Sequence, residues 1–196
     1  MSNIVDPLVR QIAARVRAER ERRRWTLAQL AEASGVSQAM ISRIEREESS
    51  PTAVVLGKLS AAFQLSVSSL LASAEGEAAV ADEGERVRRE ADAAVWRDPE
   101  TGYRRRQITS PRFPTEIAEI RLPAGAQVPY PAAAFAFIRQ LVWVLDGQLT
   151  FHEGDLVHRL HSGDTIELGE PAPRTFVNDT DTECRYVVVL ARHPQP

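Results

Sequence analysis

The stretch WTLAQLAEASGVSQAMISRIEREESSP, residues 25–51, decides how the N-terminal part of the chain folds. It predicts two short helices joined by a tight turn. Thr26-Leu27-Ala28-Gln29 has the pattern of a capping box, in which the first and last side chains satisfy each other's backbone amides at the start of a helix. Gly35 follows this helix, where glycine adopts a left-handed conformation without strain. Ser37 is the expected N-cap of the second helix, which runs to about Arg46.

Further helices are expected on both sides of this pair. Leu8, Ile12 and Val16 recur every four positions, which places them on one face of a preceding helix. Thr52 follows a proline and is the expected N-cap of a fourth helix, and Ser66 the expected N-cap of a fifth. The N-terminal part is therefore predicted to be an all-α bundle of five helices.

Charge is distributed unevenly over the three segments into which the chain divides. The net charge is −3 overall, but residues 1–72 hold ten Lys and Arg against seven Asp and Glu. Residues 73–95, rich in Ala, Glu, Gly and Arg, are expected to form a linker, and residues 96–196 a second domain. A basic end joined to an acidic remainder is compatible with one DNA-binding domain.

Composition also limits the compartment and the chemistry. Cys184 is the only cysteine, which excludes an internal disulfide and a cysteine-based zinc cluster. No apolar run reaches the roughly 18 residues of a membrane span, and the N-terminus lacks the pattern of a secretory signal. A cytoplasmic protein with no membrane association is expected.

The second domain has the pattern of an all-β fold. Strand-like runs are separated by Pro, Gly, Asp and Asn at intervals typical of an antiparallel sandwich or barrel. The predicted strands are 103–109, 115–122, 141–145, 148–152, 156–161, 164–168 and 186–190. Asp146-Gly147 is a typical hairpin turn between two of them.

The quoted stretch closely resembles the phage-repressor (Cro/C1, or XRE) family of helix-turn-helix regulators. The resemblance covers about Leu8 to Leu71 and is carried by Leu27-x-x-Leu30-Ala31, by Gly35-Val36-Ser37 and by Ile41-Ser42-x-Ile44-Glu45. It implies that the helix after Ser37 reads DNA in the major groove. It also implies that Gln38, Ala39 and Arg43 hold base-reading positions, and that Arg20 and Glu45 form a structural pair.

Helix geometry supports these assignments. Ile41 and Ile44 would point inward, so the outward N-terminal side chains could reach base edges. Gln can bind adenine, Arg guanine, and an alanine methyl can pack on thymine. Arg46 and Lys58 are plausible phosphate contacts. The predicted DNA-binding residues are Ser37, Gln38, Ala39, Ser42, Arg43, Arg46 and Lys58.

The second domain resembles the cupin family, a small jelly-roll barrel, over about residues 97–192. The segments LVWVLDGQLTF (141–151), HSGDTIEL (161–168) and PAPRTFVN (171–178) carry this resemblance. Regulators of the phage-repressor class often carry such a cupin as an effector sensor. The fold class expected is thus a five-helix bundle with a helix-turn-helix, followed by an all-β cupin.

The metal ligands that cupin enzymes use are all replaced here. Their first two histidines would fall within residues 133–136, which read Ala-Ala-Phe-Ala, the glutamate at Gln140 and the third histidine at Arg174. Transition-metal sites need several convergent N, O or S ligands, so no metal, no other cofactor and no catalytic residues are expected. His152, His158 and His161 lie outside the ligand positions and are interpreted as exposed residues at strand ends.

A metal-free cupin suggests a pocket for a small molecule. Strand alternation would turn Gln140, Val142, Val144, Arg174 and Phe176 inward. Two interpretations of Arg174 remain open, because a buried arginine needs a partner. It pairs with an internal carboxylate, or it binds an anionic ligand. The predicted effector pocket consists of Tyr130, Gln140, Val142, Arg174 and Phe176.

These features predict a transcriptional regulator that binds operator DNA and is controlled by a small-molecule effector, an anion among the candidates. A homodimer is expected, since paired helix-turn-helix domains double the base contacts. Trp143, expected on the outer face of its strand, would be an interface anchor or fill the gap between sheets. Three alternatives remain: a cupin enzyme with a DNA-binding appendage, an antitoxin-type regulator whose partner is a protein, and a DNA binder whose cupin only dimerises.

Overall fold

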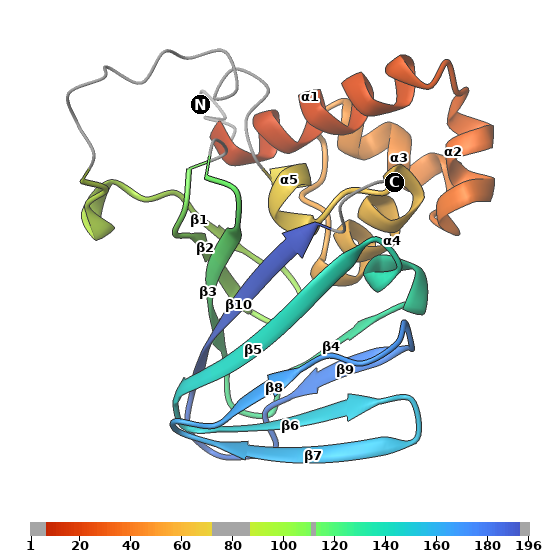
Figure 1. Ribbon diagram of the computed structural model, residues 1–196. Coiled ribbons are helices and arrows are strands. Elements are labelled where there is room, and N and C mark those ends of the chain that lie inside the picture. The colour runs from red at the N-terminus through yellow and green to blue at the C-terminus, as the bar shows by residue number, and fades with distance from the viewer. Residues whose placement is uncertain (1–6, 72–86, 111–112, 193–196) are drawn as a thin grey trace.

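A computed structural model describes residues 7–71, 87–110 and 113–192. Figure 1 shows the helices gathered at one end of the molecule and the strands at the other. The helices come first in the chain and the strands follow, so the predicted order of an all-α part and an all-β part is confirmed.

The helical part has the five predicted helices. They are α1 (Pro7–Arg22), α2 (Leu27–Ser34), α3 (Gln38–Glu45), α4 (Ala53–Phe63) and α5 (Val67–Leu71). The predicted N-caps are confirmed, because the side chains of Thr26, Ser37, Thr52 and Ser66 each accept a hydrogen bond from the backbone amide three residues on. Gly35 ends α2 in the left-handed conformation, with φ of 65°.

Packing rather than intrinsic propensity holds these helices. α2 and α3 have 8 residues each, a length at which an isolated helix is marginal in water. Their buried faces meet those of α1, α4 and α5 in one apolar core. Its side chains are at most 1% exposed: Ile12, Val16, Leu30, Ile41, Ile44, Leu56, Leu59, Phe63 and Leu70. Among the helices of the described residues, none is long and apolar enough to cross a membrane.

The β part consists of two antiparallel sheets. One sheet has the order β1-β2-β3-β10-β5-β8 and the other β4-β9-β6-β7. Two short 3₁₀ helices, η1 (Glu90–Asp92) and η2 (Ala132–Phe135), lie outside the sheets. The strands are β1 (Val95–Arg97), β2 (Arg104–Gln107), β3 (Glu116–Leu122), β4 (Gln127–Tyr130), β5 (Ile138–Asp146), β6 (Gln148–Glu153), β7 (Leu156–His161), β8 (Thr165–Glu167), β9 (Arg174–Val177) and β10 (Cys184–Arg192).

The predicted alternation along β5 is confirmed. Gln140, Val142 and Val144 are buried between the sheets, whereas Arg139 and Trp143 lie on the outer face. Trp143 is 46% exposed and therefore does not fill the space between the sheets of this chain. Side chains of alternating direction are what a strand with one buried face requires.

Two parts of the prediction need correction or stay open. β1, β4 and β9 were absent from the predicted strands, although the expected inward direction of Arg174 and Phe176 on β9 is confirmed. The described strands form two separate sheets rather than one closed sheet, so the jelly-roll barrel stays a prediction. Residues 73–86 of the predicted linker lie outside the described residues, and its remainder contains η1 and the first residue of β1.

The helical part docks directly on the β part, which the sequence did not predict. α4 packs against β4 and η2. The first backbone amide of α4, at Ala53, donates to the carboxylate of Asp98 at 2.9 Å, in the loop after β1. Near α5, the hydroxyls of Ser66 and Ser69 donate to the carboxylate of Glu116 on β3. Figure 1 shows α4 and α5 beside the ends of the strands.

Candidate nucleic-acid interface and ligand cavity

α3 presents a polar face to solvent while its apolar face is fixed in the core. Ile41 and Ile44 are at most 1% exposed and anchor the helix. Ser37, at the N-cap, accepts a hydrogen bond from the Met40 amide at 3.2 Å. The remaining N-terminal amides of α3 are available to an anion such as a DNA phosphate.

The predicted base-reading residues lie together on this face. Ser37, Gln38, Ala39 and Arg43 are exposed, and Ser42 is partly exposed. Their side chains span about two helical turns, the length that can enter a major groove from one helix end.

The two predicted phosphate contacts differ in their surroundings. Arg46 is exposed just after α3, and its guanidinium is 2.9 Å from the Glu48 carboxylate. An exposed pair of this kind contributes little to stability. Lys58 is partly buried on α4.

Arg20 and Glu45 tie α1 to α3. The guanidinium donates to both carboxylate oxygens, at 2.7 and 2.8 Å, and a third hydrogen bond reaches the Trp25 carbonyl at 3.0 Å. The hydrogen bond to Glu45 is the main reason why the pKa of Arg20 is raised. The structural pairing of Arg20 and Glu45 that the sequence implied is confirmed.

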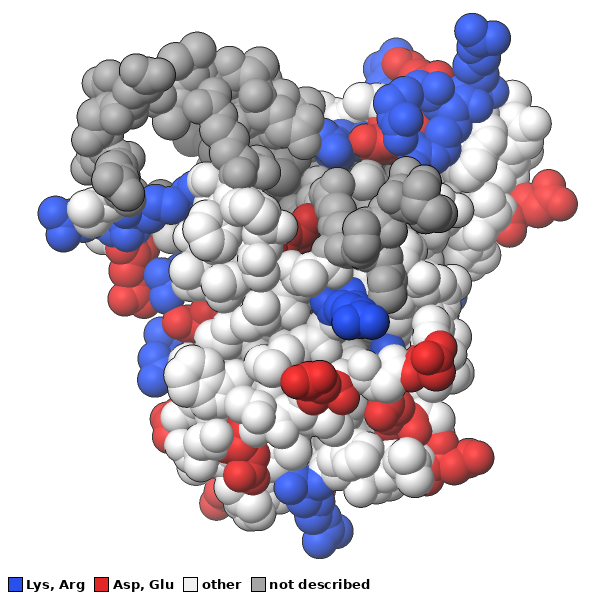
Figure 2. Space-filling view, in the orientation of Figure 1, with Lys and Arg blue, Asp and Glu red and all other residues white. Residues whose placement is uncertain are grey.

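Arg22 and Arg23, at the C-terminal end of α1, make contacts within the protein. Arg23 donates to the Phe63 carbonyl and lies over the Phe63 ring, 4.9 Å from its centroid, so it links α1 to α4. Arg22 pairs with Glu19 at 3.0 Å. Figure 2 shows Lys and Arg side chains gathered over the C-terminal end of α1.

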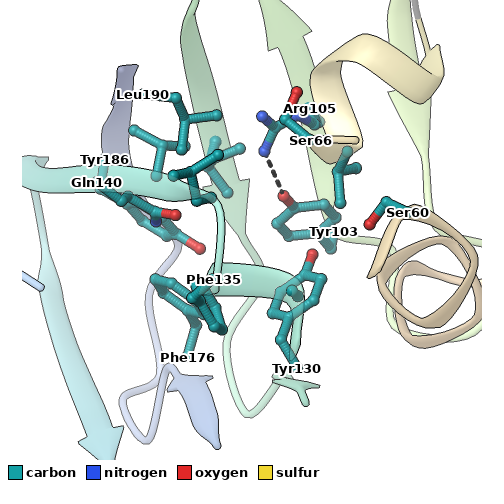
Figure 3. Close-up of a pocket in the computed structure, with 15 residues that line it drawn as sticks. Ser60, Ser66, Tyr103, Arg105, Tyr130, Phe135, Gln140, Phe176, Tyr186 and Leu190 are labelled. Atoms are coloured by element: carbon teal, nitrogen blue, oxygen red, sulfur yellow. Dashed lines mark hydrogen bonds between the residues drawn. The ribbon is translucent and has the colours of Figure 1, made fainter. Parts of the chain in front are cut away.

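A cavity lies between the two sheets and the helices α4 and α5. The side chains of Ser60, Ser66 and Val67 from the helical part close it, and strands β2, β3, β4, β5, β9 and β10 form its other walls. Figure 3 shows the rings of Tyr103 and Tyr130 between the strands and the helices. The centres of water molecules can reach about 50 Å³ of it, room for roughly three to five waters.

Three of the five predicted pocket residues line this cavity. They are Tyr130, Gln140 and Phe176, whereas Val142 and Arg174 are absent from its walls. Gln140 is 9% exposed, and its amide is a polar group in an otherwise largely apolar wall. The structure thus brings together only part of the predicted pocket.

Arg174 is satisfied by the protein itself. Its Nε and Nη2 donate to Oε1 of Glu153 at 2.9 and 2.5 Å, and Nη2 also donates to the Gly169 and Glu170 carbonyls. The guanidinium lies 4.4 Å from the centroid of the Phe135 ring. Of the two interpretations left open by the sequence, the structure shows the internal carboxylate.

The arginine that does line the cavity is Arg105 on β2, which the sequence analysis missed. It is 7% exposed and donates to the Tyr103 hydroxyl at 3.4 Å and to the Ser68 hydroxyl. Strand alternation over residues 103–107 was the available signal, because it places Tyr103 and Arg105 on one face.

The geometry of the helical part is that of a known family. The helix-turn-helix family HTH_3 matches residues 16–70. These residues are an HTH_3 domain. Over 67 residues the chain is 39% identical to the HTH-type transcriptional regulator SutR of Escherichia coli, a match that covers 34% of this chain and 38% of that protein.

Solved structures extend the likeness beyond the HTH_3 domain. An HTH_3 family transcriptional regulator from Vibrio cholerae aligns with 96% of this chain and 98% of its own, with a TM-score of 0.74 and 23% identity. The two chains therefore share their overall fold. A cupin domain of an XRE family regulator from Enterobacter cloacae aligns with 47% of this chain and 98% of that chain, with a TM-score of 0.43 and 14% identity. A score this low does not establish a shared fold.

The β part that follows the HTH_3 domain does not offer the ligands of a metal-dependent cupin. Ala134 and Phe135 are buried at the expected histidine positions, and Gln140 and Arg174 replace the other ligands. Within the described ranges, no group of three or more His, Cys, Asp and Glu could hold a metal ion. His152 and His158 are partly buried rather than exposed, and His158 is stacked on Phe151, which corrects their expected positions.

Proposed function

We propose that the chain is a transcriptional regulator that binds operator DNA through α3. The observation that carries this proposal is the exposure of Gln38, Ala39 and Arg43 on a helix whose opposite face is locked by Ile41 and Ile44. These side chains have the donors, acceptors and methyl group that direct readout of base edges requires.

The experiment starts from the whole protein and a pool of random duplex DNA. Selection of bound sequences gives a consensus, and fluorescence anisotropy then measures affinity for it and for scrambled DNA. Gln38→Ala and Arg43→Ala are each expected to reduce discrimination by about 1–3 kcal/mol, the contribution of one good base contact. Arg159→Ala, which removes an exposed arginine on β7 far from α3 in the sequence, is the matched control.

Phosphate contacts give a different signature. Lys58→Ala and Arg46→Ala are expected to weaken binding to all sequences alike and to lower the salt slope by about 1. The assignment of α3 fails if Gln38→Ala and Arg43→Ala both leave the consensus and the affinity unchanged while the protein stays folded.

We further infer that the β part is a metal-free cupin that binds a small-molecule effector and joins two chains into a dimer. Support comes from the cavity between the sheets and from the exposed Trp143 on β5. Light scattering of wild-type protein and Trp143→Ala tests the dimer, and a shift to monomer in the variant is expected. Elemental analysis tests the competing enzyme hypothesis, which requires stoichiometric metal in the purified protein.

A further inference from the structure

Arg105 has an unusual environment for a buried cation. Its side chain is enclosed by β2, α5 and the cavity, yet its only hydrogen-bond partners among the described residues are two neutral hydroxyls. Its Nε has no hydrogen-bond acceptor within that part of the chain. The Glu116 carboxylate acts on it only through space. Burial opposes the charged form of Arg105, and an anion bonded directly to its guanidinium would offset that cost.

The neighbouring side chains would complete an anion site. The Tyr103 hydroxyl is at the guanidinium, and the Tyr130 hydroxyl lies beside the Tyr103 ring, as Figure 3 shows. Burial raises the pKa of Tyr130 well above its ordinary value, and the same holds for Tyr186 on the opposite wall. Both phenols are therefore protonated and can donate hydrogen bonds at neutral pH. A guanidinium with neutral donors around it matches a carboxylate.

The rest of the cavity limits what can be attached to that carboxylate. The apolar side chains of the walls include Ile120, which is the strand partner of Arg105, and Val188 and Leu190 on β10, and they favour an apolar tail. The accessible space of about 50 Å³ corresponds to roughly three to five waters, so the ligand is small. A hollow on the surface shares Phe135, Ile138 and Gln140 with the cavity, so the two adjoin at these side chains.

The cavity lies between the HTH_3 domain and the β part. Ser60 on α4 and Ser66 before α5 close it from the HTH_3 side, and Tyr130 touches both the cavity and α4. A ligand held here contacts both parts of the chain. It would favour their docked arrangement over any other, which is the differential binding that control by a ligand requires.

We propose that this cavity binds a short-chain aliphatic carboxylate through Arg105 and thereby holds the HTH_3 domain against the β part. The proposal rests on the proposed function for its effect on DNA, but not for binding itself. It places the anion site at Arg105 on the interface between the two parts, and not at Arg174.

Binding is tested without DNA, on the full-length protein. Fluorine NMR follows 3,3,3-trifluoropropionate, and unlabelled propionate competes with it. Propionate is expected to displace the probe from one site per chain, with propionamide at least about tenfold weaker because it lacks the charge. Arg105→Lys is expected to lose about tenfold or more in affinity, whereas Arg174→Lys, the matched buried control, keeps wild-type affinity.

Several results would overturn the proposal. The first is that no straight-chain carboxylate from formate to hexanoate binds. The second is that propionamide or inorganic phosphate binds as tightly as propionate. The third is that Arg174→Lys loses binding and Arg105→Lys does not. If Arg105→Lys does not fold, nuclear Overhauser effects between the bound probe and the Tyr130 ring in wild-type protein locate the ligand, and their absence in a saturated sample counts against the site.

The effect on DNA is a separate measurement. Saturating propionate is expected to change affinity for the selected consensus at least about fivefold, the smallest of typical allosteric couplings. Propionate that binds at Arg105 and leaves DNA affinity unchanged would overturn the regulatory half of the proposal and keep the site. Absence of sequence-specific DNA binding by the protein would instead refute the proposed function while leaving the binding result intact.

Discussion

The ring of Tyr130 lies directly against the backbone of Gly57. A Cβ atom added at Gly57 would lie 2.4 Å from Cδ1 of Tyr130 and 2.8 Å from Cε1, well inside van der Waals contact. Gly57 is in the middle of α4, where glycine is normally unfavourable by roughly 1 kcal/mol relative to alanine. Its missing side chain is what allows the helical part and β4 to approach this closely.

Gly57→Ala should therefore separate the two parts. The methyl group would force the Tyr130 ring away, and we expect a loss of about 1–3 kcal/mol in the free energy of unfolding, as for other overpacked sites. Urea denaturation measures it. In a Tyr130→Ala background, Gly57→Ala should instead raise the free energy of unfolding. The clash is then absent, and alanine only improves helix propensity. Equal losses from Gly57→Ala in both backgrounds would contradict the contact.

Asp98 provides a second link between the parts. It is 2% exposed, and its carboxylate accepts the amide of Ala53 as well as those of Glu100 at 2.8 Å and Thr101 at 3.4 Å. Asp98→Ala leaves the Ala53 amide without this acceptor, and we expect a loss of about 1–3 kcal/mol in stability. Hydrogen exchange should show faster exchange of the Ala53 amide.

Thr52→Ala is the matched control for Asp98→Ala. Thr52 caps the same helix from within the HTH_3 domain, where its side chain accepts from Val55 at 3.3 Å. Its removal should cost about 1 kcal/mol through the helix alone and leave the ligand cavity closed. Protection of the amides of α5 distinguishes the two variants, since only Asp98→Ala is expected to expose the face where α5 meets β3. Identical exchange patterns would show that Asp98 does not hold the parts together.

The helical part could be predicted from the sequence because its signals are local. Thr26, Ser37 and Thr52 each cap a helix through an amide three residues away, and Gly35 ends α2 through its own conformation. In the β part, short strands were harder to predict from the sequence. β1 has 3 residues and β4 has 4, one of them Pro129, so neither has a run long enough to show alternation.

Candidate site residues could be predicted only where the alternation of side chains along a strand shows which of them point between the sheets. It placed Gln140 and Phe176 between the sheets, but it could not choose between a partner and a ligand for Arg174. That choice depends on register, because Glu153 on β6 lies directly opposite Arg174 on β9. The docking of α4 and α5 joins residues such as Ser66 and Glu116, 50 positions apart, and no local pattern encodes such contacts. Alternation places Arg105 on the same face as Tyr103, but only the docking of α5 shows that this face is enclosed.

The pair Arg20–Glu45 should contribute far more to stability than the exposed pair Arg17–Glu21 of α1. Its side chains are 15% and 9% exposed, whereas those of Arg17–Glu21 are 63% and 54% exposed. Glu45→Gln leaves a largely buried guanidinium with a weaker acceptor, and we expect a loss of about 2–4 kcal/mol. Arg17→Gln, which removes the exposed partner of Glu21 and leaves the contacts of Arg20 in place, is the control, with an expected change of at most about 0.5 kcal/mol. Urea denaturation at low and high salt compares them, and similar effects of the two substitutions would refute the structural role.

The stability of the β part should fall in acid because of Glu119. Burial raises the pKa of this carboxyl, but hydrogen bonds from Arg106 and Arg121 and their positive charges outweigh burial, so the pKa lies below its ordinary value of 4.5. A carboxyl with a lowered folded-state pKa binds fewer protons in the folded chain than in the unfolded one. Its contribution is therefore fully present above about pH 5 and is lost as pH falls through the folded-state pKa.

Urea denaturation between pH 3 and pH 7 measures this acid limb. Glu119→Gln should lower stability at pH 7 and flatten the decline below about pH 5, because the neutral amide mimics the protonated acid at every pH. Glu167→Gln on β8, where the carboxylate is exposed and the structure records no ion pair for it among the described residues, is the control and should leave the slope near that of wild type. A Glu119→Gln protein with an unchanged acid slope would show that Arg106 and Arg121 do not hold this carboxylate charged.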